Sequence, residues 1–170
     1  MLDETIITET PPLYSCYGRV GQQTCIPISG NHARRIIHGA LNVHTGAVAL
    51  LITRTWNQTT HQGFLDLLRS QWRGWQIVLF EDRGTPHTAA TSQAYAAALN
   101  IQLRFLPPAT PELNAMDQLW RQTKRQSLAD CPMSSIDAAA LALCQYVIDL
   151  SPQARLRKAG VLSGNFWLTK

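Results

Sequence analysis

A nearly continuous apolar run at residues 76–80 constrains the fold of this chain more than any other segment. Strands with this composition are buried on both faces, as in parallel sheets that are covered by helices. The run ends in Glu81 and Asp82. Thr85 and Pro86 then have the form of a helix N-cap followed by proline at the first helical position. We therefore predict a buried strand that leads into a helix extending to about residue 99.

The neighbouring segments complete a pattern of strands and helices. Two β-rich stretches, residues 35–43 and 47–55, flank a turn that contains Gly46, which indicates a hairpin. Asn57 is placed to cap a helix over residues 59–72. The remaining predicted elements are a strand at 101–106, an extended loop at the prolines 107–111, and helices at 113–127, 134–150 and 152–158. This order predicts an α/β fold with a mixed central sheet flanked by helices.

Composition restricts the class of protein. The 170 residues suit one compact domain over residues 1–170, and 45% hydrophobic against 15% charged residues excludes a disordered chain. The net charge of +4 favours anionic partners only weakly. The acidic N-terminus lacks the apolar core of a signal peptide, and the apolar run at residues 138–148 is too short to span a bilayer. The four cysteines form no C-x-x-C pair, which favours reduced thiols. We expect a cytoplasmic protein with no membrane segment.

Three aspartates combine an acidic side chain with a suitable position in the predicted fold. Asp82 follows the buried strand, where open α/β sheets bind ligands. Asp117 lies in the first turns of the helix after the proline loop, and Asp3 lies in the first apolar-flanked segment. Clustered carboxylates suit Mg²⁺ or Mn²⁺, and two such ions can promote phosphodiester cleavage. Taken alone, however, an aspartate at a strand end is more often a solvated cap or turn residue.

The segments around these aspartates carry a family resemblance. They are MLDE at residues 1–4, FEDRGTPHT at residues 80–88, and LPPATPELN at residues 106–114, which runs on into Asp117 and Trp120. The second and third resemble the second-aspartate motif and the proline-rich signature of mariner-like transposases and their bacterial insertion-sequence relatives. The 34 residues between Asp82 and Asp117 are an interval common in that group. The first segment and residues 39–46 are similar to the family's first motif and hairpin.

The resemblance implies a function and a fold. It implies an RNase H-like domain that cuts and transfers DNA strands in the transposition of an insertion sequence. Asp3, Asp82 and Asp117 would be the catalytic and metal-binding residues, with Mg²⁺ as the cofactor and Mn²⁺ as its substitute. DNA would be the partner, as transposon ends and target, and the protein would associate with the bacterial nucleoid. A homodimer is compatible with the resemblance.

The sequence also departs from the family pattern. Arg83 stands where asparagine is usual, and Asp117 stands where many bacterial relatives have glutamate. The helix-turn-helix region that precedes the catalytic core in the family is expected to be missing or separate. Only Met1 and Leu2 precede Asp3, so we expect a first strand that is truncated at its N-terminus. Because chain ends fray, Asp3 would be mobile or displaced and metal binding would be weak.

Five basic residues are candidates for DNA contact. Arg121, Lys124 and Arg125 follow Asp117 on about the same helical face, where they would hold phosphates or, equally, form pairs on a solvated face. Arg34 and Arg35 precede the first hairpin strand and are further candidates.

One histidine is a candidate for a supporting role. His87 lies at the start of the helix after Asp82, and the resemblance implies that it supports the active site. His32, His38 and His44 lack a partner at ligand spacing, and we interpret them as ordinary residues.

Two other functions remain open. One is a transposase remnant that binds DNA without cutting it, and the other is a different RNase H-like nuclease, such as a junction resolvase. Bound metal with plasmid nicking would favour the transposase, DNA retention without either would favour the remnant, and a preference for branched DNA would favour the resolvase.

Overall fold

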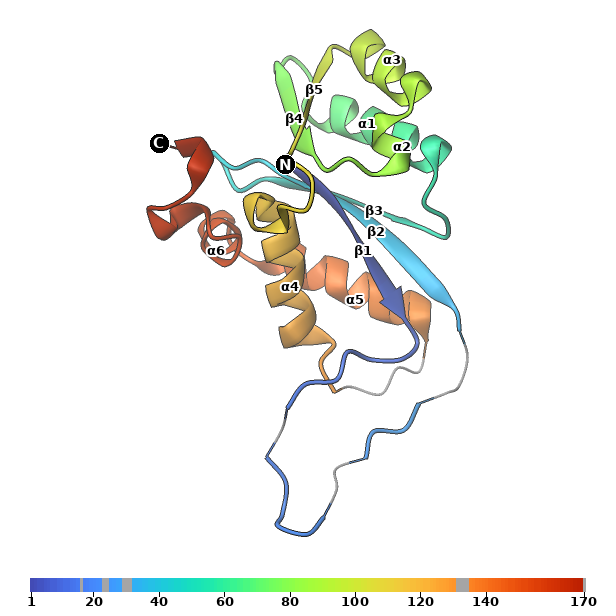
Figure 1. Ribbon diagram of the computed structural model, residues 1–170, viewed down its shortest axis with the longest axis vertical. Coiled ribbons are helices and arrows are strands. Elements are labelled where there is room, and N and C mark those ends of the chain that lie inside the picture. Colours follow the sequence, from blue (N-terminus) through green and yellow to red (C-terminus); the bar gives the residue numbers. More distant parts are fainter. Residues whose placement is uncertain (16, 23–24, 29–31, 131–134, 170) are drawn as a thin grey trace.

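Two groups of strands form the centre of the computed structural model (Figure 1). β1 (Leu2–Thr8), β2 (Arg34–Leu41) and β3 (Val48–Thr53) form an antiparallel sheet in the order β1-β2-β3. β4 (Ile77–Glu81) and β5 (Ile101–Phe105) form a parallel pair. The structure describes residues 1–15, 17–22, 25–28, 32–130 and 135–169.

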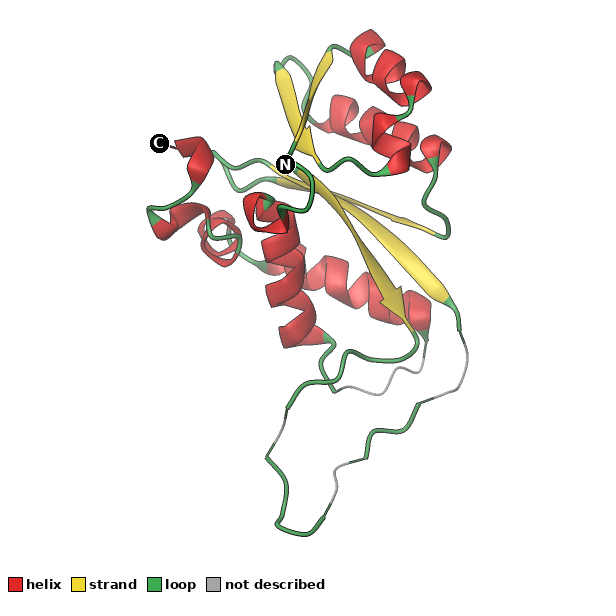
Figure 2. Cartoon of the chain, viewed as in Figure 1, coloured by secondary structure: helices red, strands yellow, loops and turns green. Residues whose placement is uncertain are grey.

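Helices lie on both sides of the β1–β3 sheet (Figure 2). α1 (Gln58–Gln71), α2 (Thr85–Thr88) and α3 (Ala90–Ala98) lie on one side together with β4 and β5. α4 (Ala115–Ser127), α5 (Ile136–Asp149) and α6 (Pro152–Lys158) lie on the other. Short 3-10 turns occur at η1 (Pro111–Leu113), η2 (Val161–Ser163) and η3 (Trp167–Thr169).

The alternation of side chains along the strands produces two hydrophobic cores. On one face of the sheet, Ile37 and Leu41 of β2 belong to a core that includes Leu119 of α4 and Leu143 of α5. On the other face, Ala40 belongs to a core that includes residues of α1, β4 and β5. β1 follows the same alternation, so neighbouring residues of this strand face different cores.

The predicted mixed α/β architecture is confirmed. Its strands, however, form two separately hydrogen-bonded sheets, β1-β2-β3 and β4-β5. Within the described residues, no ladder connects β1 to β4, although these strands are in contact. β1 begins at Leu2, close to the carboxyl end of β4 (Figure 2). The two strands therefore overlap over too short a length to form an extended ladder.

The helix predicted after Asp82 is wrong in detail. Gly84 rather than Thr85 is its N-cap residue, and the segment is divided into α2 and α3 by Ala89, whose backbone is extended at ψ 131°. The break lets α2 end after one turn, with His87 buried and hydrogen-bonded to Asp82 and to Glu4 of β1. These tertiary contacts outweigh the continuous helical pattern of the sequence.

The other predicted elements agree with the structure to within a few residues. Asn57 caps α1 as predicted, in a reciprocal capping box with Thr60. α5 corresponds to the helix predicted at 134–150, of which Ser134 lies outside the described residues, as do Cys16 and Cys131. In the part of the chain that the structure describes, no helix has both the length and the apolar character needed to cross a membrane.

Candidate active site

The three aspartates predicted as metal ligands line one cleft of about 490 Å³. Asp3 comes from β1, Asp82 directly follows β4, and Asp117 lies in the first turn of α4. The rest of the lining comes from Arg83 and Gly84 and from the proline loop that leads from β5 to α4. Three segments that are far apart in the sequence therefore contribute one carboxylate each to the same cleft.

Asn114 fixes the start of α4 against β1. Its side-chain oxygen accepts a hydrogen bond from the backbone N–H of Met116 at 3.0 Å and so caps the helix. Its Nδ2 donates to the carbonyl of Leu2 at 2.8 Å. Trp120, further along α4, donates from Nε1 to the carbonyl of Asp3 at 3.4 Å. These contacts set the position of Asp117 relative to Asp3.

The expectation that Asp3 would be mobile or displaced is not supported by the structure. β1 continues beyond Asp3 to Thr8 and is paired with β2 over its whole length. The backbone amine of Met1 donates to the carbonyl of Leu41 at 2.8 Å, and the Leu41 N–H donates to the carbonyl of Met1 at 2.8 Å. Sheet hydrogen bonds thus hold β1 on both sides of Asp3. Most of the strand follows the aspartate rather than preceding it.

Gly39 provides the space that this arrangement needs. It lies opposite Asp3 in the β1–β2 ladder. A Cβ atom at Gly39 would lie 2.4 Å from both the indole of Trp120 and the side chain of Met116. The close approach of α4 to the sheet beside Asp3 therefore requires glycine here.

The electrostatics of the cleft favour a cation. Burial raises the pKa of Asp3 to about 8, and repulsion from Glu4, Asp117 and Asp82 contributes to the rise. Asp82 Oδ1 accepts from the Gly84 N–H at 2.9 Å and from His87, and this leaves Oδ2 for a metal. Asp117 uses Oδ2 in an ion pair with Arg121, which leaves Oδ1. The residues thus offer the oxygen ligands that Mg²⁺ and Mn²⁺ prefer.

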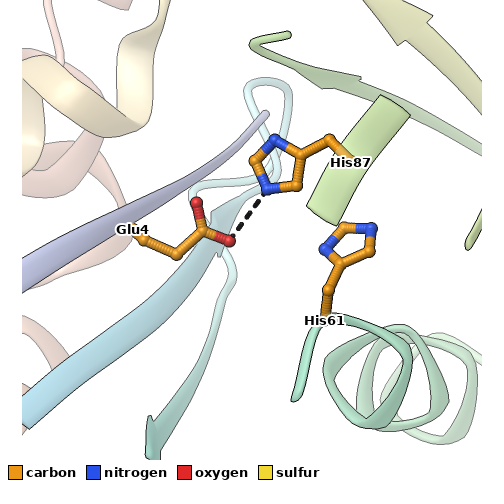
Figure 3. Close-up of side chains that lie close together, drawn as sticks. All are labelled: Glu4, His61 and His87. Carbon is orange, nitrogen blue, oxygen red and sulfur yellow. Dashed lines mark hydrogen bonds and ion pairs between the residues drawn. The ribbon is translucent and has the colours of Figure 1, made fainter. Parts of the chain in front are cut away.

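The aspartates line the cleft without forming a compact group. Among the described residues, the one group of three potential ligands within 4.8 Å of one another is Glu4, His61 and His87 (Figure 3). That the three aspartates bind metal stays a prediction.

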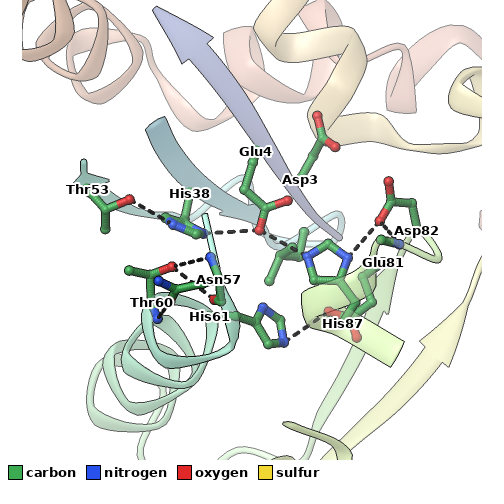
Figure 4. A network of polar contacts seen from close by, with 12 residues as sticks. Asp3, Glu4, His38, Thr53, Asn57, Thr60, His61, Glu81, Asp82 and His87 are labelled. Atoms are coloured by element: carbon green, nitrogen blue, oxygen red, sulfur yellow. Dashed lines mark hydrogen bonds and ion pairs between the residues drawn. The ribbon is translucent and has the colours of Figure 1, made fainter. Parts of the chain in front are cut away.

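His87 connects Asp82 to the interior of the protein (Figure 4). Its Nδ1 lies 2.7 Å from Asp82 Oδ1, and its Nε2 lies 3.1 Å from Glu4 Oε1. Burial opposes protonation of His87, but hydrogen bonds to Asp82 and Glu4 outweigh it and raise the pKa of His87 to about 11. The hydrogen bond from His87 also lowers the pKa of Asp82. His87 therefore orients Asp82 and stabilises its ionised form.

Comparisons with known proteins identify the family and the fold of the chain. A family model described as DDE superfamily endonuclease matches residues 1–138. The chain belongs to this family. A comparison with curated proteins found no match.

Solved structures of Mos1 transposase have the same fold as this DDE superfamily member. The Mos1 paired-end complex with the left transposon end has a TM-score of 0.73 at 16% identity, covering 97% of this chain and 52% of that chain. The Mos1 mariner paired-end complex with Mn has a TM-score of 0.73 at 18% identity, with 97% and 52% covered. The catalytic domain of Mos1 mariner transposase has a TM-score of 0.67 at 15% identity, with 97% and 76% covered. The predicted RNase H-like fold is confirmed, and the chain spans about half the length of the Mos1 chains in the DNA complexes.

In this DDE domain, the three basic residues of α4 are engaged in contacts within the protein. Arg121 pairs with Asp117 at 3.0 Å, and Lys124 donates from Nζ to the carbonyl of Ile6 at 2.9 Å. The guanidinium of Arg125 lies 5.6 Å from the centre of the Tyr14 ring. Any contact of these three residues with DNA would compete with the interactions described.

Arg34 and Arg35 are not brought to the cleft. They pair with the far end of β1, where Arg34 lies opposite Thr8, whereas Asp3 lies opposite Gly39. Arg35 makes a bidentate ion pair with Asp137 of α5 at 2.5 and 2.8 Å. Arg35 thus ties β2 to α5, and the exposed Arg34 is the freer candidate for DNA contact.

Two histidines behind the cleft have a role that the sequence patterns did not reveal. His38, interpreted as ordinary, lies opposite Glu4 in the β1–β2 ladder and approaches its carboxylate at 3.1 Å. His61 was not singled out, although it continues the buried stripe of α1 that includes Phe64 and Leu68. A histidine on such a stripe was the available signal for His61, whereas His38 could be found only from the strand register.

Proposed function

We propose that this chain performs metal-dependent DNA strand cleavage and strand transfer in the transposition of an insertion sequence. The observation that carries the proposal is that Asp3, Asp82 and Asp117 line one cleft from three separate elements. Membership of the DDE superfamily of endonucleases supports this function.

The three aspartates would hold Mg²⁺, or Mn²⁺ in its place. Bound divalent ions would activate the attacking oxygen and stabilise the leaving one. The chain's other residues keep the carboxylates in position. His87 holds Asp82 through one oxygen, and Asn114 and Trp120 hold the backbone on either side of the Asp3 Cα.

DNA is the proposed partner, both as transposon ends and as target. The fold matches to Mos1 complexes that contain transposon ends support this proposal. The cleft is lined by Arg83, and Lys124 lies close enough to Asp3 and Asp117 to interact with their charges. These cations would contact phosphates beside the carboxylates. The proposal also includes two further partners. One is a helix-turn-helix region that recognises DNA, and the other is a second copy of the chain in a homodimer.

The test is Asp82→Asn, compared with Glu112→Gln as a matched control. The asparagine side chain is nearly isosteric with aspartate but has no charge, so plasmid nicking in Mg²⁺ or Mn²⁺ should be abolished while the circular dichroism spectrum is retained. Glu112 is exposed in η1 and does not line the cleft, so its variant should nick at the wild-type rate. Retained nicking in Asp82→Asn would remove Asp82 from the mechanism.

A remnant that binds DNA without cutting is the second candidate. The observation that favours it is that Asp82 and Asp117 are already partnered by His87 and Arg121. Wild-type protein that retains DNA but shows neither Mn²⁺ binding nor nicking would support the remnant and contradict the enzyme.

A further inference from the structure

A second group of potential metal ligands lies behind the cleft. The side chains of Glu4 from β1, His61 from α1 and His87 from α2 converge there, with one ligand atom of each within 4.8 Å of the others (Figure 3). Both histidines are fully buried, and the Glu4 side chain is only 9% exposed. Asp3, the neighbour of Glu4, points away from this group toward the cleft (Figure 4).

One member of this group and one neighbouring side chain have buried polar atoms without hydrogen-bond partners. Among the described residues, these atoms include both ring nitrogens of His61 and both carboxylate oxygens of Glu81. Both side chains are completely buried. Because nearly all buried polar atoms in folded proteins have partners, orphaned atoms of two facing side chains indicate a missing ligand.

Each of the three candidate ligands has an outer partner that suits metal binding. His38 Nδ1 lies 3.1 Å from Glu4 Oε1, and His87 Nδ1 lies 2.7 Å from Asp82 Oδ1. His61 Nε2 lies 3.7 Å from Glu81 Oε2. The contact of His87 with Asp82 has the form in which metal-binding histidines commonly donate their other ring N–H to a carboxylate. The His61–Glu81 pair faces the same way but lies beyond hydrogen-bond distance. The arrangement leaves His87 Nε2, His61 Nδ1 and the Glu4 carboxylate for an ion.

We propose that Glu4, His61 and His87 form a second metal site, for Zn²⁺ or a similar transition metal. Two imidazoles with one carboxylate suit Zn²⁺, whereas the cleft offers the all-oxygen set that Mg²⁺ and Mn²⁺ prefer. Tetrahedral ligands at roughly 2.1 Å from an ion lie roughly 3.4 Å apart. The 3.1 Å separation of Glu4 Oε1 and His87 Nε2 is close to this spacing.

Metal binding would replace the hydrogen bond between Glu4 and His87. The proton on His87 Nε2 would pass to solvent, and neutral His87 would bind the ion through Nε2 while its Nδ1–H donates to Asp82. The second metal would thereby fix His87, and through it Asp82, without entering the cleft. This site does not depend on the proposed function, because it can be measured without DNA or cleavage.

The experiment is a titration of chelator-treated protein with Co²⁺ and Zn²⁺ in excess Mg²⁺. Isothermal calorimetry should give one Zn²⁺ per chain, and Co²⁺ should produce the strong visible absorption of a tetrahedral nitrogen–oxygen site. His61→Asn should lower the Zn²⁺ affinity more than tenfold, whereas His44→Asn, at an exposed hairpin histidine, should leave it unchanged. Asp117→Asn, in the cleft, should also leave it unchanged.

Several outcomes would overturn the proposal. They are the absence of Zn²⁺ binding by the wild-type chain, wild-type affinity in His61→Asn, and loss of binding in Asp117→Asn. Glu4→Gln provides a second test that is nearly isosteric, should His61→Asn fail to fold by circular dichroism. Loss of tight Zn²⁺ binding in folded Glu4→Gln would support the site, and retained binding would contradict it.

Discussion

At the scale of single residues, neighbouring acids have separate environments. Asp3 and Asp82 line the cleft, whereas Glu4 and Glu81, each adjacent in sequence to one of them, are turned into the interior. Burial raises the pKa of Glu81 to about 7. Hydrogen bonds from His38 and His87 overcome the effect of burial on Glu4 and lower its pKa to about 2. Because neighbouring residues of an extended chain point to opposite sides, Asp3 and Asp82 face the cleft, whereas Glu4 and Glu81 face the interior.

The raised pKa of Asp3 predicts that metal binding releases a proton. Without metal, the pKa of about 8 keeps Asp3 mostly protonated at pH 7, and a cation can bind its carboxylate only after the proton leaves. Mn²⁺ affinity should therefore rise as the pH increases toward 8 and then level off. Calorimetry at pH 7 in two buffers of different ionisation enthalpy measures the proton release. Identical enthalpies in both buffers would show that Asp3 is already ionised or is not a ligand.

At the scale of elements, the cleft depends on how α4 is attached to β1. The helix begins at Ala115, and its cap residue Asn114 also holds the carbonyl of Leu2. The same side chain therefore stabilises the helix end and fixes its distance from the strand that carries Asp3. Gly39 completes the contact, because its lack of a side chain allows the indole of Trp120 to lie directly on the sheet.

Asn114→Ala should affect both stability and metal binding. Loss of the cap costs about 1–2 kcal/mol of unfolding free energy, and the buried carbonyl of Leu2 loses its partner in addition. Ser151→Ala is the matched control, because Ser151 caps α6 in the same way but is exposed. Urea unfolding should show the larger loss for Asn114→Ala, and only this variant should bind Mn²⁺ more weakly. Equal effects of the two substitutions would mean that the link to β1 contributes nothing.

At the scale of the whole molecule, the charge distribution predicts weak and unspecific DNA binding. The net charge is only +4, and four of the five basic residues considered for DNA contact make contacts within the protein. Phosphate contacts carry no sequence information by themselves. Specific recognition is expected from a helix-turn-helix region, as in the family that the sequence resembles.

Gel shifts with unrelated duplexes over a salt series test this prediction. Affinity should be similar for all sequences and should fall steeply as salt increases, because binding releases counterions from the phosphates. Arg34→Ala should reduce the affinity and the salt dependence slightly for every duplex. A strong preference for one sequence at physiological salt would contradict the prediction.

The sequence by itself determined the fold class and the three cleft residues. Local patterns specify local structure, so the buried run before Asp82, the cap at Asn57 and the proline loop before Asp117 could all be interpreted without a structure. The motifs that resemble those of mariner-like transposases added the expectation that Asp3 belongs to the same site as Asp82 and Asp117. The positions of all three aspartates around one cleft agree with these inferences, and their role as ligands stays a prediction.

Only the tertiary structure decided what surrounds these residues. Whether Asp3 is held depends on the register of β1 with β2, and the break at Ala89 depends on the buried partners of His87. The cluster of Glu4, His61 and His87 likewise joins three elements that are separated in sequence. Long-range pairing and burial arise from the packing of the whole chain, and no local pattern contains them. The sequence therefore specified the carboxylates of the cleft and His87 beside them, and the packing specified the partners that surround His87.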